Sequence, residues 1–216
     1  MLHHFYFTTA LRLSTSSSII QEAEALSDAG LALVSYFYCD FKAIAKQEIR
    51  GLLTSLLAQL CAESDPCYDV LCDLYSRHDE GLRKPDDHTL IECLKKMFTL
   101  PGQPMIYVIV DGLDECPNAS GLPTAREKVL NFLEDLVTLK LSNLRLCVTS
   151  RPEIDIKIIL EPVASLRVSL HDENGQRSDI LDYISNVVHS DRKMRRWSAE
   201  DKQLVIDTLC AKANGM

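Results

Sequence analysis

The chain contains only eight glycines in 216 residues, and none of them is followed by Lys-Ser or Lys-Thr. The phosphate loop G-x-x-x-x-G-K-[ST] requires that pattern, because its backbone N–H groups and its lysine cradle the phosphates of a nucleotide. The missing pattern therefore argues against tight binding of a nucleoside triphosphate.

The eight cysteines include no C-x-x-C pair, and their spacing matches neither a zinc site nor a disulfide framework. Several of them, such as Cys39 and Cys147, lie within apolar stretches and are predicted to be small core residues. Free thiols in this number are typical of a reducing compartment, so we expect a cytoplasmic protein.

The amino terminus lacks the features of a membrane segment. Residues 1–13 are apolar and aromatic, but Arg12 interrupts them, and the stretch is too short to span a bilayer. It also lacks the charge pattern of a signal peptide. The net charge of −8 argues against a general nucleic-acid surface. We therefore expect neither a membrane nor a nucleic acid as a partner.

Alternation of apolar patterns predicts an α/β protein with a core of ordinary size. The leucine-rich stretch at residues 49–60 has the 3.6-residue spacing of a helix that packs on a core. Strands are predicted over residues 31–41, 105–110, 144–150 and 163–170. Helices are predicted over residues 19–29, 43–62, 67–78, 87–98, 124–139, 178–189 and 198–213.

The most informative segment joins an apolar strand to a cluster of acids. Six apolar residues, 105–110, run directly into Asp111, Gly112, Asp114 and Glu115. A short run of this kind is typical of a parallel strand buried on both faces, and open α/β sheets bind ligands at the carboxyl ends of their strands. Clustered carboxylates there suit Mg²⁺, which usually arrives with phosphates. Alternatively, Asp-Gly is a simple turn and the acids are solvated.

A second strand ends in groups of complementary chemistry. Residues 144–150 (LRLCVTS) lead into Arg151 and Pro152, so a hydroxyl and a guanidinium lie at the exit of a neighbouring strand. The guanidinium fork of arginine matches phosphate oxygens, although Arg151 could instead pair with a nearby acid.

Together these segments carry a resemblance to a known family. DGLDE after an apolar strand, followed by a helix and LCVTSRP, resembles the Walker B and sensor 1 motifs of NACHT-type STAND NTPases. More narrowly, the chain resembles the nephrocystin 3-like NACHT domain of fungal ankyrin- and WD-repeat proteins. Residues 34–41 are similar to the second core strand of that family, and residues 49–60 to the following helix.

The resemblance implies a role for each strand-end residue. Asp111 would hold Mg²⁺, and Asp114 and Glu115 would position or deprotonate the attacking water, with Glu115 the preferred base. Arg151 would sense the γ-phosphate. The cofactors would be Mg²⁺ and ATP or GTP, and the state of the nucleotide would switch the packing of neighbouring domains.

By the same resemblance, the lysine of the phosphate loop would align near Arg12. Arg12 has the same positive charge as that lysine, so it is the candidate nucleotide-binding residue. No glycine flanks it. The residues before Arg12 are few for a first strand plus a phosphate loop. The expected fold is therefore a three-layer P-loop NTPase-like parallel sheet flanked by helices, missing its first strand and P-loop.

The expected organisation has three parts. Residues 1–15 form an atypical lead, residues 16–170 a truncated NACHT-like nucleotide-binding core, and residues 171–216 the start of a helical region. The expected function is that of a truncated signalling NTPase domain, ancestrally a nucleotide-dependent switch and weak or inactive without a P-loop. The alternative is a non-catalytic interaction module that keeps only the fold. In both cases the expected partners are proteins, through self-association or downstream repeat or effector domains.

Overall fold

The computed structural model describes residues 4–8, 12–118, 123–169, 174–191 and 193–213. The chain divides into two compact units, Met1–Val168 and Ser169–Met216. In the first unit the strands are β1 (His4–Thr8), β2 (Ala32–Tyr38), β3 (Met105–Asp111), β4 (Leu144–Ser150) and β5 (Leu166–Ser169). The helices are α1 (Arg12–Asp28), α2 (Ile49–Glu63), α3 (Asp65–Arg77), α4 (Asp87–Phe98), α5 (Ala125–Thr138) and α6 (Ile154–Leu160), with short turns η1 (Ile44–Lys46), η2 (Asp79–Gly81) and η3 (Leu113–Glu115).

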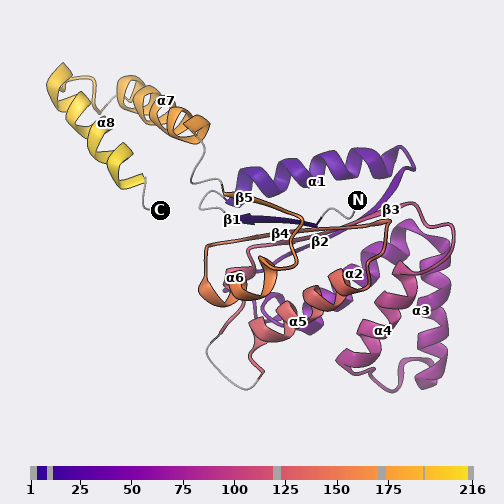
Figure 1. The fold of residues 1–216 in the computed structure, drawn as a ribbon. Coiled ribbons are helices and arrows are strands. Elements are labelled where there is room, and N and C mark those ends of the chain that lie inside the picture. Colours follow the sequence, from indigo (N-terminus) through magenta and orange to yellow (C-terminus); the bar gives the residue numbers. More distant parts are fainter. Residues whose placement is uncertain (1–3, 9–11, 119–122, 170–173, 192, 214–216) are drawn as a thin grey trace. The chain divides into compact units, whose positions relative to one another are not determined.

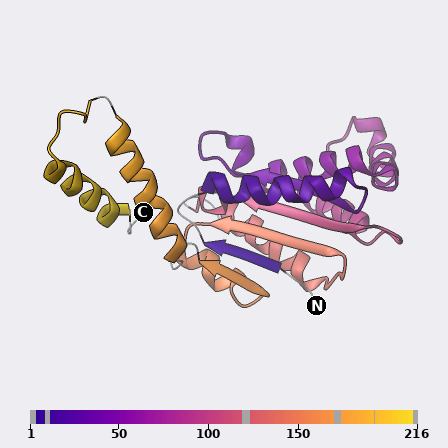
Figure 2. The same cartoon turned by 90° about the horizontal axis from the view of Figure 1, so that it is seen from above.

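The five strands form one sheet in the order β2-β3-β4-β1-β5. The pairs β2/β3, β3/β4 and β4/β1 are parallel, and the strand arrows run side by side in Figure 2. Val110 lies opposite Val148 in the register of β3 and β4. The carboxyl ends of these neighbouring strands therefore meet at one edge of the sheet, as the sequence predicted.

The three-layer α/β class is confirmed, but one expected detail is different. We expected no first strand, and His4–Thr8 forms β1, which pairs with β4 from His4↔Leu146 to Thr8↔Ser150. Within the described residues, the expected lead is thus partly a strand of the sheet and partly the first turn of α1, which begins at Arg12. The strand needs only five residues, so it fits between the amino terminus and the start of α1 at Arg12.

The two faces of the sheet carry hydrophobic cores of different size. Helices α2 to α6 cover one face, and α1 covers the other (Figure 1). The first face buries a large cluster that includes Leu52, Leu56, Leu94 and Phe132. The second face buries Ile20 and Ala23 of α1 against Val34, Ile109 and Cys147 of the strands. Because apolar burial is the main favourable term in folding, the α2 side supplies most of the stability.

Helix α2 begins later than the sequence pattern predicted. The pattern predicted one helix over residues 43–62, whereas the structure has the separate turn η1 before α2 starts at Ile49. Gly51 explains the close packing of the two elements, because a Cβ at this position would overlap the carbonyl oxygen of Ala45.

Side-chain caps fix the starts of α4 and α5. Asp86 caps α4 by accepting a hydrogen bond from Thr89 N at 2.8 Å. Thr124 caps α5 and forms a capping box with Glu127. Such caps satisfy backbone N–H groups that have no partner inside the helix.

The second unit contains α7 (Asn174–Ser190) and α8 (Ala199–Ala213), which contact one another. Ser198 caps α8 by accepting a hydrogen bond from Asp201 N at 3.0 Å. Among the described residues, no helix combines the length and apolarity needed to cross a bilayer.

Candidate functional site

Asp111 lies at the carboxyl end of β3 and is only 6% exposed. Its Oδ1 accepts a short hydrogen bond from the hydroxyl of Thr149, which lies near the end of the neighbouring strand β4. The same hydroxyl accepts a hydrogen bond from Gly112 N at 3.0 Å. Gly112 has a left-handed backbone (φ +70°) that favours glycine, and it turns the chain into η3. Thr149 therefore joins the acid of β3 to β4.

Asp114 and Arg151 meet across the ends of β3 and β4. The backbone N of Arg151 donates to Asp114 Oδ1 at 3.0 Å, and the Arg151 Nε lies 3.7 Å from Asp114 Oδ2. The side chain of Asp114 is 5% exposed, whereas that of Arg151 is 67% exposed. The carboxylate is thus built into the loop, and the guanidinium reaches toward solvent.

Glu115 connects the acid loop to the chain segment after β2. Its Oε2 accepts a hydrogen bond from Phe41 N at 3.1 Å. In the same region, Cys39 N donates to the carbonyl oxygen of Asp111 at 2.9 Å. The ends of β2 and β3 are therefore held together by one main-chain bond and one side-chain bond.

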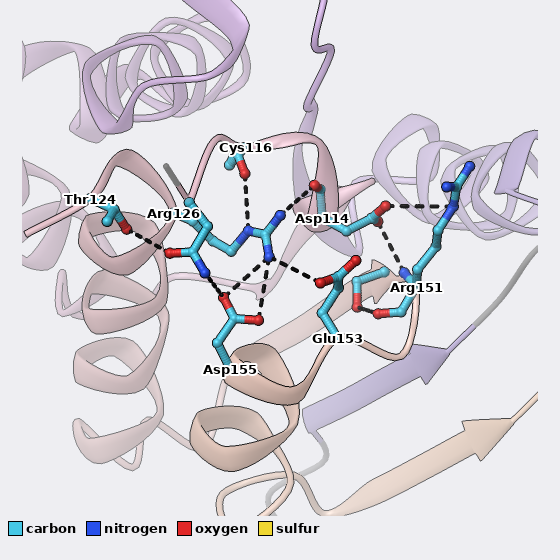
Figure 3. A network of polar contacts seen from close by, with 9 residues as sticks. Asp114, Cys116, Thr124, Arg126, Arg151, Glu153 and Asp155 are labelled. Atoms are coloured by element: carbon cyan, nitrogen blue, oxygen red, sulfur yellow. Dashed lines mark hydrogen bonds and ion pairs between the residues drawn. The ribbon is translucent and has the colours of Figure 1, made fainter. Parts of the chain in front are cut away.

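A buried arginine holds the acid loop from the other side. Arg126, in the first turn of α5, is 7% exposed. Its guanidinium donates to the carbonyl oxygens of Asp114 (2.7 Å) and Cys116 (2.9 Å). It also contacts the carboxylates of Asp155 at 3.1 Å and Glu153 at 3.6 Å, on and beside α6. Figure 3 shows this guanidinium between the acid loop and the start of α6. The charge of Arg126 is thus paired while its fork satisfies two loop carbonyls.

Three thiols near this edge have perturbed acidity. The sulfurs of Cys39 and Cys116 lie 3.5 Å apart, within hydrogen-bond distance. This contact and burial raise the pKa of Cys39, whereas the contact with Cys39 and the charge of Arg126 lower the pKa of Cys116. Burial raises the pKa of Cys147, on β4, to about 12.

The structure brings together most of the residues selected from the sequence. Asp111, Asp114, Glu115 and Arg151 lie at the joined ends of β3 and β4, as expected. Arg12 is the first residue of α1, and its side chain lies outside the described part of the chain.

These residues fit only part of a magnesium–nucleotide site. Asp111 supplies the kind of oxygen ligand that Mg²⁺ prefers. However, no group of three or more His, Cys, Asp or Glu side chains converges on a metal position within the described ranges. On the phosphate side, residues 9–11 link β1 to α1 and contain neither glycine nor lysine, whereas the phosphate loop needs both. The residues present therefore do not fit a bound triphosphate.

Sequence reasoning missed two residues that organise this edge. Thr149 carried no signal, because a threonine in a strand is ordinary. Arg126 did carry one, since it occupies the same helical face as the buried Val129, Leu130 and Leu133. A charged residue on the apolar face of a helix requires a buried partner, and this signal could have identified it.

The fold and the strand-end motifs together define a NACHT-like P-loop NTPase domain. A family model confirms this class: the model described as nephrocystin 3, N-terminal, matches residues 14–151. The chain therefore belongs to the nephrocystin 3 N-terminal domain family. No curated protein matches the chain.

Three solved structures match the chain at low identity. A chain of the Aeropyrum pernix ORC1 protein in complex with DNA matches with a TM-score of 0.49 and 14% identity, over 84% of this chain and 42% of that one. A chain of Drosophila ORC bound to AT-rich DNA and Cdc6 matches with a TM-score of 0.43 and 12% identity, over 98% and 69%. A chain from Drosophila ORC bound to poly(dA/dT) DNA and Cdc6 matches with a TM-score of 0.42 and 8% identity, over 88% and 32%. Likenesses at this level say nothing about what this chain binds.

Proposed function

We propose that this domain is a signalling module of NTPase fold whose nucleotide hydrolysis is weak or lost, descended from a nucleotide-dependent switch. The observation that carries the proposal is the contrast at one edge of the sheet. The acid residues are in place at the ends of β3 and β4, whereas residues 9–11 offer no glycine or lysine to a phosphate. Phosphoryl transfer depends on positioning and charge neutralisation, so the loss of that half removes most of the catalysis.

The contacts of the acids support the same conclusion. Asp111, Asp114 and Glu115 each accept a hydrogen bond from a protein donor, namely the hydroxyl of Thr149 and the backbone N–H groups of Arg151 and Phe41. These bonds give the carboxylates a structural role that is independent of Mg²⁺. The roles of base for Glu115 and of γ-phosphate sensor for Arg151 belong to an intact ancestor.

The alternative function is that of a protein-interaction module that keeps only the fold. One observation favours it: Ile154 and Ile158 are 77% and 69% exposed and lie one turn apart on α6, directly after Arg151. Arg126 ties the same helix to the acid loop. On either version of the proposal, the domain acts through protein contacts, with copies of itself or with further domains, in the cytoplasm. Its eight free cysteines are consistent with a reducing setting.

Thermal unfolding with millimolar Mg-ATP or Mg-GTP, together with phosphate release, tests the proposal. A ligand present at 100 times its Kd adds about 2.7 kcal/mol of stability. For a chain of this size that raises the Tm by roughly 5–10 °C. We expect no resolvable shift and no phosphate release above background.

A saturable rise in Tm together with phosphate release, both of which disappear in Arg12→Ala or Asp111→Asn, would overturn the proposal and restore a working site. Arg83→Ala is the matched control for Arg12→Ala, because the side chain of Arg83 is 70% exposed and pairs only with Asp79 among the described ion pairs. A rise that persists in Arg12→Ala and Asp111→Asn would locate the nucleotide elsewhere and leave the proposal intact.

A further inference from the structure

Two buried thiols face one another beside the acid loop. Cys39 follows β2, and Cys116 follows η3 after β3. Their sulfurs lie 3.5 Å apart, and the residues are 7% and 1% exposed. Both belong to the large core cluster on the α2 side of the sheet, so the contact between the two thiols is part of the packed core.

The backbone around both cysteines is fixed independently of the thiols. Cys39 N donates to the carbonyl oxygen of Asp111 at 2.9 Å, and the carbonyl oxygen of Cys116 accepts from Arg126 Nε at 2.9 Å. Since a disulfide has an S–S distance of about 2.05 Å, the sulfurs need to approach by only about 1.5 Å. Rotation about the side-chain bonds of the two cysteines would supply that movement.

From this geometry we infer that Cys39 and Cys116 form a reversible disulfide when the domain meets a peroxide. A peroxide is the appropriate class of oxidant because it is small, uncharged and takes up the two electrons that a pair of thiols gives up. The site is distinct from the proposed nucleotide chemistry and does not depend on it.

The reaction proceeds in two balanced steps. The sulfur of Cys116, as its thiolate, attacks one oxygen of hydrogen peroxide and breaks the O–O bond, which gives a sulfenic acid and a hydroxide that is protonated to water. The sulfur of Cys39 then attacks the sulfenic sulfur, forms the S–S bond and displaces hydroxide, which takes the proton of Cys39 and leaves as a second water. Two thiols are oxidised and one peroxide is reduced to two waters. The positive charge of Arg126 beside Cys116 favours the first step.

The disulfide would tie the end of β2 to the acid loop. It would join two residues that are 77 apart in the sequence. Cross-linking a loop of that length removes much of the entropy of the unfolded chain, so the Tm should rise by an amount on the order of 10 °C. The bond would also hold Glu115 next to its partner Phe41, and thereby reduce the mobility of the acid loop.

Peptide mapping of the full chain without reductant tests the inference, after treatment of the reduced protein with hydrogen peroxide. We expect one cross-linked pair of peptides that contains Cys39 and Cys116, two hydrogens lighter than the free peptides and cleaved by dithiothreitol. The Tm should rise with the cross-link and return on reduction. Cys116→Ser should abolish both effects. Cys147→Ser is the matched control, since Cys147 is equally buried but lies in the separate cluster on the α1 side, and it should leave both unchanged.

The inference is overturned if Cys39 and Cys116 remain free thiols while the more accessible Cys72 and Cys210 are oxidised. It is also overturned if either thiol cross-links to a different cysteine, or if both proceed to sulfinic acids without a bond between them. The map of the unsubstituted chain decides these outcomes even if Cys116→Ser does not fold, and Cys39→Ala provides a second variant.

Discussion

The two halves of the strand-end edge differ in how their residues are held. At the ends of β3 and β4, Asp111, Asp114 and Glu115 are bonded to the neighbouring strand and loops. At the end of β1, which pairs in register with β4 up to Thr8↔Ser150, the link to α1 spans three residues without glycine or lysine. The first half therefore has a role in the fold, whereas residues 9–11 contain neither the glycine nor the lysine of a phosphate loop.

A carboxylate at the end of a strand can have a catalytic role or a structural role. In a working NTPase the acid holds the metal or positions the water, so its removal acts on catalysis. In this chain the three acids also accept hydrogen bonds from the hydroxyl of Thr149 and from two backbone N–H groups, so their removal should destabilise the domain. Stability measurements on matched variants can therefore test this structural role of the acids without any nucleotide.

Replacement of Arg126 should have the largest effect. Arg126→Met removes donors from two loop carbonyls and leaves Asp155 without its closest cationic partner, at a side chain that is 8% exposed. Breaking a buried pair costs about 3–5 kcal/mol, and because Asp155 is 32% exposed we expect about 3 kcal/mol. Urea unfolding measures this loss as a lower midpoint at unchanged slope.

The control for Arg126→Met is Arg77→Met. The side chain of Arg77 is 72% exposed and lies 3.9 Å from Asp73, so its loss should cost at most about 0.5 kcal/mol. Equal effects of the two substitutions would show that Arg126 does not hold the acid loop.

Replacement of Thr149 should have an intermediate effect. Thr149→Val keeps the shape of the side chain but removes the donor to Asp111 and the acceptor for Gly112 N, both in a buried position. Leaving buried polar groups unpaired costs about 1–3 kcal/mol, so we expect about 2 kcal/mol in urea unfolding. Thr149→Ser keeps the hydroxyl and should recover most of the loss. If Thr149→Val unfolds like the unsubstituted chain, the Asp111 carboxylate does not depend on β4.

Much of the fold followed from patterns along the chain. The apolar runs at residues 105–110 and 144–150 correctly predicted β3 and β4 as neighbours, because short buried strands in an α/β pattern pair in parallel. The leucine spacing correctly predicted α2 as a core helix. The acid cluster and Arg151 were therefore placed together from sequence alone.

The remaining features depend on contacts between distant residues. Strand β1 was missed because the residues before Arg12 were judged too few for a strand plus a full phosphate loop, whereas the strand itself needs only five of them. The hydrogen bond between Thr149 and Asp111 joins residues 38 positions apart, and the register that creates it appears only in the folded sheet.

Replacement of Arg151 should have the smallest effect, and this result would show most directly that the acids, and not the guanidinium, support the fold. Arg151→Met removes only a guanidinium that is 67% exposed and 3.7 Å from Asp114 Oδ2, while the backbone N of residue 151 still donates to Asp114 Oδ1. Exposed ion pairs contribute little, so we expect a loss below about 0.5 kcal/mol in urea unfolding. Asp114→Ala is the matched partner variant and should cost about 1–2 kcal/mol, because it leaves the backbone N–H without its acceptor. A large loss in Arg151→Met would mean that the guanidinium, and not only the acids, is part of the structural network.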